Sequence, residues 1–375
     1  MIYFLTEVTK IIIQAASGVV EGVLRKNFWL EITNNTISHI EDGVSEKADT
    51  VIEGILIPGF VDIHCHGGGG AYFSSHDPED IDRVIEAHKK HGTTSLLASL
   101  VSEPIEKLLE QIKRINPYVG SSSIKGIHLE GPYLSHARCG AHDPALLRTP
   151  SVKELQRLLD AGQGNISMIT LAPELEGALD AIDFLVEEGV VVALGHTEAS
   201  AHIALEAIDY GATIITHFTN GMPKLGSDAG TITEVALADD RLSLELILDG
   251  THIKKEDTEE ILALASHRSI LVTDAISAAG GSDGHYKIGE LDVDVSKGIA
   301  RLVSNKSLAG STLTMDRAFL KLHKDFKVSI EDAVNSSSAL PAGEIGMGNV
   351  GEIALGMSAD LLELTQTGEV AVIHS

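Results

Sequence analysis

Between residues 58 and 345, short and nearly continuous apolar runs alternate with longer stretches in which apolar residues recur every three or four positions. The apolar runs predict strands buried on both faces, and the longer stretches predict amphipathic helices that cover them. Strands are expected at residues 59–66, 93–100, 124–130, 166–171, 190–195, 213–217, 242–248 and 270–274. Helices are expected at residues 78–91, 103–115, 152–161, 175–188, 200–210 and 257–266.

This alternation predicts an α/β fold with a parallel sheet, because parallel strands need helical crossovers between them. Eight strand–helix units over this part of the chain are the number found in a (β/α)8 barrel of the TIM type. An open, doubly wound sheet is the alternative arrangement of the same units.

The two ends of the chain have a different pattern, in which apolar and polar residues alternate between turn signals. This pattern is typical of half-buried antiparallel strands. They are expected at residues 11–14, 28–32 and 37–40 near one end, and at 351–353, 360–364 and 370–373 near the other. We therefore predict a small β-sandwich domain formed by residues 1–57 plus 346–375, and a barrel domain formed by residues 58–345.

The first barrel strand is expected to end in His64-Cys65-His66. Alternate residues of a strand share a face, so His64 and His66 are expected to point the same way and Cys65 the opposite way. Two imidazoles on one side form a metal-ligand pair, whereas Cys65 is expected to pack as a small buried residue. The glycines that follow lack the Gly-Lys-Ser/Thr sequence of a phosphate-binding P-loop.

Metal-binding side chains also stand at the ends of four other expected strands: Glu130, His196, His217 and Asp274. The carboxyl ends of barrel strands meet at one rim, where such folds place their active sites. Imidazole and carboxylate ligands suit Zn²⁺, Fe²⁺, Mn²⁺ or Co²⁺, and a metal of this kind lowers the pKa of a water molecule. A nearby carboxylate can move the proton of that water, and Asp274 is the candidate for this general base and acid.

Composition narrows the list of partners. The formal net charge of −26 argues against nucleic acid or an anionic membrane surface, because both need basic patches. Two cysteines, Cys65 and Cys139, do not provide a disulfide framework, which fits a reducing cytoplasm. No signal-peptide pattern or bilayer-length apolar run is apparent, so a cytoplasmic protein acting on a small molecule is expected.

Taken together, these motifs resemble the amidohydrolase superfamily and, within it, the N-acetylglucosamine-6-phosphate deacetylases. The resemblance spans nearly the whole chain in order, and its most specific parts are the segment Glu130-Gly131-Pro132 and the segment of residues 216–223. The matching segments are residues 58–67, 128–134, 140–144, 195–197, 216–223, 249–252, 271–275 and 308–311.

The resemblance implies a metal-dependent hydrolysis of an N-acetyl amide that releases acetate and an amino sugar phosphate, in a protein that forms a homodimer. Glu130, His196 and His217 would hold the principal metal, and His64 and His66 a second one, so that one or two ions are bound. Asp274 would be the general base and acid, and His252 would polarise the acetyl carbonyl. The sugar would be bound by Ala141, His142, Asn220, Gly221, His252, Leu308, Ala309 and Gly310.

This chain departs from the family pattern in the segment that follows residue 223. Ser227 stands where the family typically has an arginine that reaches the phosphate of the sugar, and Asp228 adds a negative charge. Lys224 is a candidate replacement, as a point charge rather than a guanidinium fork. Gly221 stands where alanine is common, and Cys139 precedes the sugar-site segment.

Alternative functions therefore remain open at this stage. One is a deacetylase of an unphosphorylated or epimeric N-acetyl amino sugar, including the galactosamine epimer. Another is a cyclic amidohydrolase acting on a pyrimidine or hydantoin ring, which commonly uses a bridging lysine where this chain has Glu130. A third is a barrel without activity that serves as a binding protein, which the retained ligand residues disfavour.

Overall fold

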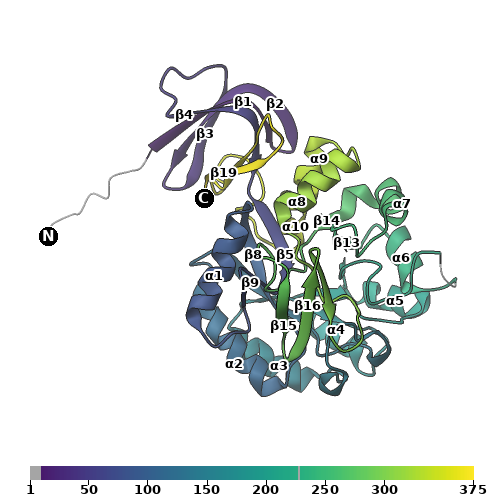
Figure 1. Cartoon of the computed structure of the whole chain (residues 1–375). Coiled ribbons are helices and arrows are strands. Elements are labelled where there is room, and N and C mark those ends of the chain that lie inside the picture. Colours follow the sequence, from purple (N-terminus) through teal and green to yellow (C-terminus); the bar gives the residue numbers. More distant parts are fainter. Residues whose placement is uncertain (1–9, 227–228) are drawn as a thin grey trace.

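Eight parallel strands form one sheet in the computed structural model, which describes residues 10–226 and 229–375 (Figure 1). The first and last strands lie side by side, because Cys65 and Ala275 form a parallel bridge and Asp274 N donates to His64 O at 2.8 Å. The sheet therefore closes into a barrel, and the open-sheet alternative is wrong. The strands follow in spatial order: β5 (Phe60–Cys65), β8 (Thr93–Leu100), β9 (Ile124–Glu130), β10 (Ile166–Leu171), β11 (Val191–Leu194), β12 (Ile214–Ile215), β13 (Ser243–Leu246) and β14 (Ser269–Leu271).

Helices surround the barrel, and their starts follow from local sequence. The side chains of Asp77, Ser151 and Ser200 each accept a hydrogen bond from a backbone N–H in the first turn of the following helix. The helices are α1 (Pro78–Lys89), α2 (Ile105–Ile115), α3 (Val152–Gly162), α4 (Ala178–Glu187), α5 (Ala201–Asp209), α6 (Ile232–Ala238), α7 (Lys255–Ala265), α8 (Met315–Leu320), α9 (Ile330–Val334) and α10 (Leu340–Glu344). None of these described helices is long and apolar enough to cross a membrane.

Shorter helical turns link these elements. The 3-10 turns are η1 (Asn116–Tyr118), η2 (His136–Arg138), η3 (Pro144–Leu146) and η4 (Ser266–Arg268). Two π-helical segments, η5 (Lys321–Asp325) and η6 (Asn335–Ala339), follow α8 and α9. Such i→i+5 turns are uncommon and often occur near functional sites.

The small β domain combines both ends of the described chain in one sheet around its own apolar core, which includes Phe28, Leu30 and Leu361. In spatial order its strands are β19 (Val370–His374), β18 (Leu361–Leu364), β4 (Thr50–Pro58), β1 (Lys10–Val20), β2 (Val23–Thr33) and β3 (Thr36–Asp42). This arrangement confirms the predicted β-sandwich built from distant segments (Figure 1). The exact domain bounds at residues 57/58 and 345/346 stay a prediction.

Two features of this domain differ from the sequence-based expectation. Strand β4 was not predicted, and it pairs with β1 in parallel rather than antiparallel fashion. Residues 351–353 do not form a strand; Ile353 instead fills the domain core, and its carbonyl accepts from the N–H of Glu21 at 3.1 Å. The buried apolar side chain explains why this loop has a strand-like pattern.

An antiparallel lobe after β14, also unpredicted, consists of β15 (Gly284–Ile288), β16 (Leu291–Ser296) and β17 (Ile299–Leu302). It lies in front of the barrel in Figure 1 and has a separate small core. Another short hairpin, β6 (Gly67–Gly68) with β7 (Ala71–Tyr72), follows β5. These additions leave the carboxyl ends of the barrel strands as the framework of the site.

Candidate active site

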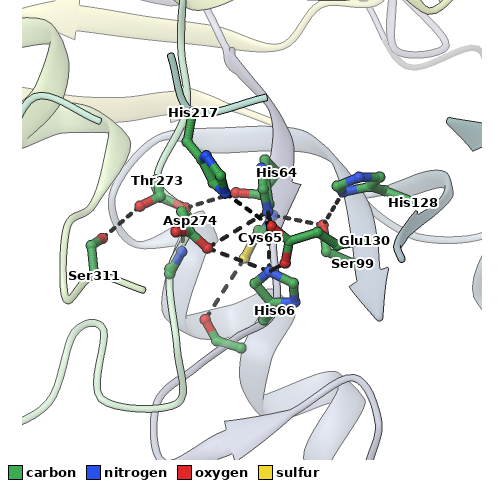
Figure 2. A network of polar contacts seen from close by, with 12 residues as sticks. His64, Cys65, His66, Ser99, His128, Glu130, His217, Thr273, Asp274 and Ser311 are labelled. Carbon is green, nitrogen blue, oxygen red and sulfur yellow. Dashed lines mark hydrogen bonds and ion pairs between the residues drawn. The ribbon is translucent and has the colours of Figure 1, made fainter. Parts of the chain in front are cut away.

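The side chains predicted from the sequence to bind metal converge at the carboxyl ends of the barrel strands, and Figure 2 labels His64, His66, Glu130, His217 and Asp274 among them. His64 lies in β5 and His66 directly after it, and Glu130 is the last residue of β9. His196, His217 and Asp274 lie in the turns that follow β11, β12 and β14. All six are at most 8 % exposed.

Three of these residues have an unusual backbone conformation. His196, His217 and Asp274 have φ values of 47°, 28° and 46°. This left-handed region is rarely adopted by residues other than glycine, and such strain concentrates at functional sites. Here it marks the points at which the chain leaves the barrel strands β11, β12 and β14, while the three side chains stay directed toward Glu130 or His66.

Glu130 is the centre of the cluster. Its Oε1 atom lies 3.1 Å from His196 Nε2 and 3.0 Å from His217 Nε2, and the two nitrogens are 3.0 Å apart. Its Oε2 atom lies 3.3 Å from His66 Nε2 and 3.3 Å from His142 Nε2. One carboxylate therefore connects two groups of imidazoles.

Asp274 completes the second group. Its Oδ1 atom lies 3.4 Å from His66 Nε2 and 3.6 Å from His64 Nε2, and these two nitrogens are 3.1 Å apart. In Figure 2 the side chains of Asp274, Glu130 and both histidines point toward one another.

The cluster fits one or more divalent cations. His64 Nδ1 lies 3.0 Å from Glu245 Oε2 and His196 Nδ1 lies 2.7 Å from Arg138 O, so each ring, when neutral, would donate through Nδ1 and direct a bare Nε2 lone pair inward. Bare nitrogens facing a carboxylate repel it unless a cation lies between them. Ligand bonds of about 2.0–2.2 Å at angles of about 90–110° would also separate neighbouring ligand atoms by roughly 2.8–3.6 Å, a range that covers the distances given above.

The electrostatics also favour positive charge at this point. Burial opposes protonation of His64, but Glu245 and Glu130 outweigh it and hold the pKa of His64 well above its usual value. Burial would raise the pKa of Glu130, but the imidazoles of His142 and His64 hold the pKa of this carboxyl well below its usual range. The carboxylate is thus ionised and available as a ligand.

A hollow of about 230 Å³ lies above the cluster. Most of the residues predicted to bind substrate line it, together with Gly140, Ile288 and Ser307, which were not predicted. Ala309 does not: its side chain is buried in the core of the lobe, beside Ile276 and Val293. The predicted residues in the lining are Glu130, Ala141, His142, His196, His217, Asn220, Gly221, His252, Asp274, Leu308 and Gly310.

Two histidines that line the hollow differ in the hydrogen-bonding group that they present, a donor in one and an acceptor in the other. His142 Nδ1 accepts from Ser102 N at 3.3 Å, so the neutral ring carries its proton on Nε2, toward Glu130. Burial lowers the pKa of His142 and favours this neutral form. His252 Nδ1 lies 2.8 Å from Asp249 Oδ2 and donates to it, which leaves Nε2 of the neutral ring as an acceptor.

The comparisons with known proteins agree with this geometry. Residues 55–372 match the model of the amidohydrolase family. The N-acetylgalactosamine-6-phosphate deacetylase of Escherichia coli O157:H7 is 33% identical over 91% of this chain and 93% of its own length. The N-acetylglucosamine-6-phosphate deacetylase of Vibrio furnissii is 31% identical over 88% of this chain and 85% of its own.

Among solved structures, an N-acetyl-D-glucosamine-6-phosphate deacetylase mutant from Mycobacterium smegmatis, in complex with N-acetyl-D-glucosamine-6-phosphate, is 38% identical. It superposes with a TM-score of 0.94 over 98% of both chains. The chain belongs to the amidohydrolase family. Within that family, the predicted kinship with the N-acetylglucosamine-6-phosphate deacetylases is confirmed.

Several polar residues that support this amidohydrolase site were missed from sequence. Glu245 of β13 is fully buried, and its Oε2 atom binds both His64 Nδ1 and the backbone N–H of His217, at 3.0 Å each. Asp62 accepts from Thr273 Oγ1 at 2.6 Å, and burial raises the pKa of Asp62 to about 6. Both are carboxylates within apolar runs, and a charged residue in such a run is the sequence signal that could have identified them.

Gly221 has a role other than making room for the sugar. Its φ is +61°, and a Cβ placed there would lie 3.0 Å from His196 Nδ1. A side chain would therefore be strained and would press on the imidazole of His196, a candidate metal ligand.

The remaining predicted positions are less central. Cys65 is buried and points to His88, with its Sγ 3.2 Å from His88 Nε2. Cys139 is partly exposed in the loop before Gly140. Lys224 is exposed, donates to Thr219 O at 2.7 Å and lies outside the lining of the hollow, while Ser227 and Asp228 lie outside the described residues.

Proposed function

We propose that this amidohydrolase hydrolyses the N-acetyl amide of N-acetylglucosamine 6-phosphate, releasing acetate and glucosamine 6-phosphate. The observation that carries the proposal is the convergence of four histidines, His64, His66, His196 and His217, on the Glu130 carboxylate. They lie directly beneath a sugar-sized hollow that Asp274, His142 and His252 line. The names of the relatives support the choice of substrate.

The residues that would hold a principal divalent ion are Glu130, His196 and His217, and His64 and His66 would complete a second site. Zn²⁺, Fe²⁺, Mn²⁺ and Co²⁺ all suit these ligands. The ion supplies a lowered pKa for water, and thus a nucleophile near neutral pH.

Asp274 is placed to move the proton of the reaction. It lies at the edge of the hollow, 3.4 Å from His66 Nε2, and burial is outweighed by His64 and His66, so the pKa of Asp274 is lowered and the group starts as a carboxylate. We infer that it takes a proton from the attacking water and delivers it to the departing amine nitrogen.

His142 is better suited than His252 to polarise the acetyl carbonyl. Its Nε2–H is a neutral donor fixed by Ser102 and aimed at the centre of the cluster, where charge develops on the carbonyl oxygen. His252 offers an acceptor instead, which suits a hydroxyl group of the sugar. The sequence-based assignment of the carbonyl to His252 is therefore revised in this proposal.

The galactosamine epimer is a second candidate substrate, because two of the relatives are named N-acetylgalactosamine-6-phosphate deacetylases. An unphosphorylated sugar is the other alternative, because Ser227 replaces the expected arginine. The deciding experiment measures acetate release from both phosphorylated epimers and from unphosphorylated N-acetylglucosamine, with each of the four metals added. We expect the highest kcat/KM with N-acetylglucosamine 6-phosphate.

A higher value for either other sugar would move the assignment to that sugar, and absence of acetate from all three would refute the proposal. A homodimer and a cytoplasmic location belong to the same proposal. Sedimentation of the metal-loaded protein checks the first, and fractionation of the source cells checks the second.

A further inference from the structure

A second cavity, separate from the substrate hollow, has a charge opposite to that of the chain. Its volume is about 540 Å³, within the range of small-molecule sites. Four lysines and one aspartate line it, a formal excess of three positive charges in a protein with a net charge of −26. These residues are Lys255, Lys321, Lys324, Lys327 and Asp325.

Three of these lysines come from one short segment. The π-helical turn η5 begins at Lys321, and Phe326 N donates to Lys321 O at 3.3 Å. The wider turn brings Lys321, Lys324 and Lys327 to the same cavity wall. Lys324 Nζ donates to Gly368 O at 2.6 Å, and none of the three forms an ion pair within the described residues. Their charges therefore lack a fixed counter-charge.

The opposite wall carries both signs of charge: Lys255 lines it, and the first turn of the helix there also contains Glu256 and Asp257. Helix α7 starts there at Lys255, and no side chain caps its first turn. The amino end of a helix carries partial positive charge and free N–H groups. Lys255 itself has only a long contact of 3.6 Å with Glu259.

The cavity also touches the loop that carries His252. A Cβ on Gly250 would collide with Lys321 Nζ, so this ammonium group lies against the backbone of Gly250. The preceding residue, Asp249, accepts from Thr251 N at 2.7 Å and from His252 N at 2.9 Å. This turn therefore contributes Gly250 to the wall of the second cavity and His252 to the lining of the substrate hollow.

We propose that this cavity binds a phosphomonoester dianion. Lysines around a helix amino end suit phosphate oxygens, and the volume exceeds what one free phosphate fills, which favours a sugar phosphate over inorganic phosphate. This site is independent of the deacetylation proposed above.

Lysine acylation followed by mass spectrometry tests the site on the full-length, metal-loaded protein. Glucose 6-phosphate, inorganic phosphate and glucose are compared at one ionic strength set with chloride. We expect glucose 6-phosphate to slow acylation of Lys321 and Lys327 at least threefold and to leave the exposed Lys113 and Lys153 unchanged.

Each other outcome would overturn all or part of the proposal. Protection by inorganic phosphate alone would keep an anion site but overturn the sugar phosphate. Protection by every salt alike would show an adventitious ion only, and equal protection of Lys113 and Lys153 would show a general effect of charge; both overturn the proposal.

A matched pair of variants gives a second measurement. Lys321→Ala with Lys327→Ala should weaken binding of glucose 6-phosphate at this site at least tenfold by calorimetry, and the two Lys→Arg replacements should restore most of it. Lys113→Ala with Lys153→Ala removes the same charge elsewhere and should have little effect. Equal weakening in both pairs would mean that only net charge matters and would overturn the proposal.

Discussion

The two oxygens of Glu130 face different surroundings. Around Oε1, the contacts to His196 and His217 are 3.0–3.1 Å, and a longer contact of 3.7 Å reaches His64 Nε2. Around Oε2, the contact to His66 is longer, at 3.3 Å, and Asp274 brings a second carboxylate within 3.4 Å of the same ring. The Oε1 side thus resembles a ligand set, and the Oε2 side also contains a group that can carry a proton.

This difference suggests that the two oxygens of Glu130 serve different functions. The tighter side would retain an ion through the reaction cycle, because its atoms are already spaced as ligands. The looser side would manage proton transfer next to the hollow. Each of the following variants tests one side against the other.

Glu130→Ala removes the carboxylate shared by both sides and should have the largest effect. We expect metal content to fall well below one equivalent and turnover to fall by more than about 10⁴-fold, because the water loses its activating ion. Elemental analysis and acetate release measure the two effects. Exposed Glu110→Ala is the control, and wild-type metal content in Glu130→Ala would show that the ligand set is wrong.

Asp274→Asn alters the proton-carrying group alone. We expect turnover to fall at least about 10³-fold while the metal bound by the Oε1 side remains, because an amide can no longer shuttle the proton. Elemental analysis of the same samples used for kinetics makes the separation visible. If this variant lost metal as completely as Glu130→Ala, the two sides would be one site.

His142→Gln and His252→Gln test the opposite polarities of the two histidines. Loss of the donor at His142 should lower kcat by about 10²–10³-fold with little change in KM, as for a lost oxyanion donor. Loss of the acceptor at His252 should act mainly on KM. Steady-state kinetics of both variants with one substrate distinguishes the two roles. A fall in kcat for His252→Gln and a rise in KM for His142→Gln would mean that His252 polarises the acetyl carbonyl.

Glu245→Gln should have the smallest effect of the set. The amide keeps the size of the side chain and an acceptor for His217 N, but it weakens the hold on His64 Nδ1. Loss of such a supporting carboxylate typically costs about 10–100-fold in metal affinity. Titration with a competing chelator should find this loss in the ion nearest His64, and an equal loss on the Oε1 side would argue against the division.

The sequence predicted the barrel better than its additions, for a physical reason. The predicted bounds of β8, β9 and β10 match the structure, because a strand covered on both faces is a continuous apolar run with sharp ends. Strand β4 and the β15–β17 lobe were missed because their exposed positions break that pattern. The π-helical turns have no distinct periodicity to detect.

The site shows the same contrast. The candidate metal ligands were found because they terminate apolar runs. Glu245 and Asp62 were missed because they lie within the runs, where Glu245 Oε2 accepts from His64 Nδ1 and Asp62 Oδ2 accepts from Thr273 Oγ1. Roles that depend on a ring tautomer, such as those of His142 and His252, required the neighbouring atoms.

The small β domain imposes an order of events during synthesis. Strand β4 ends at Pro58, but its neighbour β18 begins at Leu361, so about 300 residues must be translated before that edge is covered. At typical elongation rates this delay is roughly 15–60 s. Until then the nascent chain presents an unpaired strand, which makes the growing polypeptide a natural client for chaperones that shield such edges.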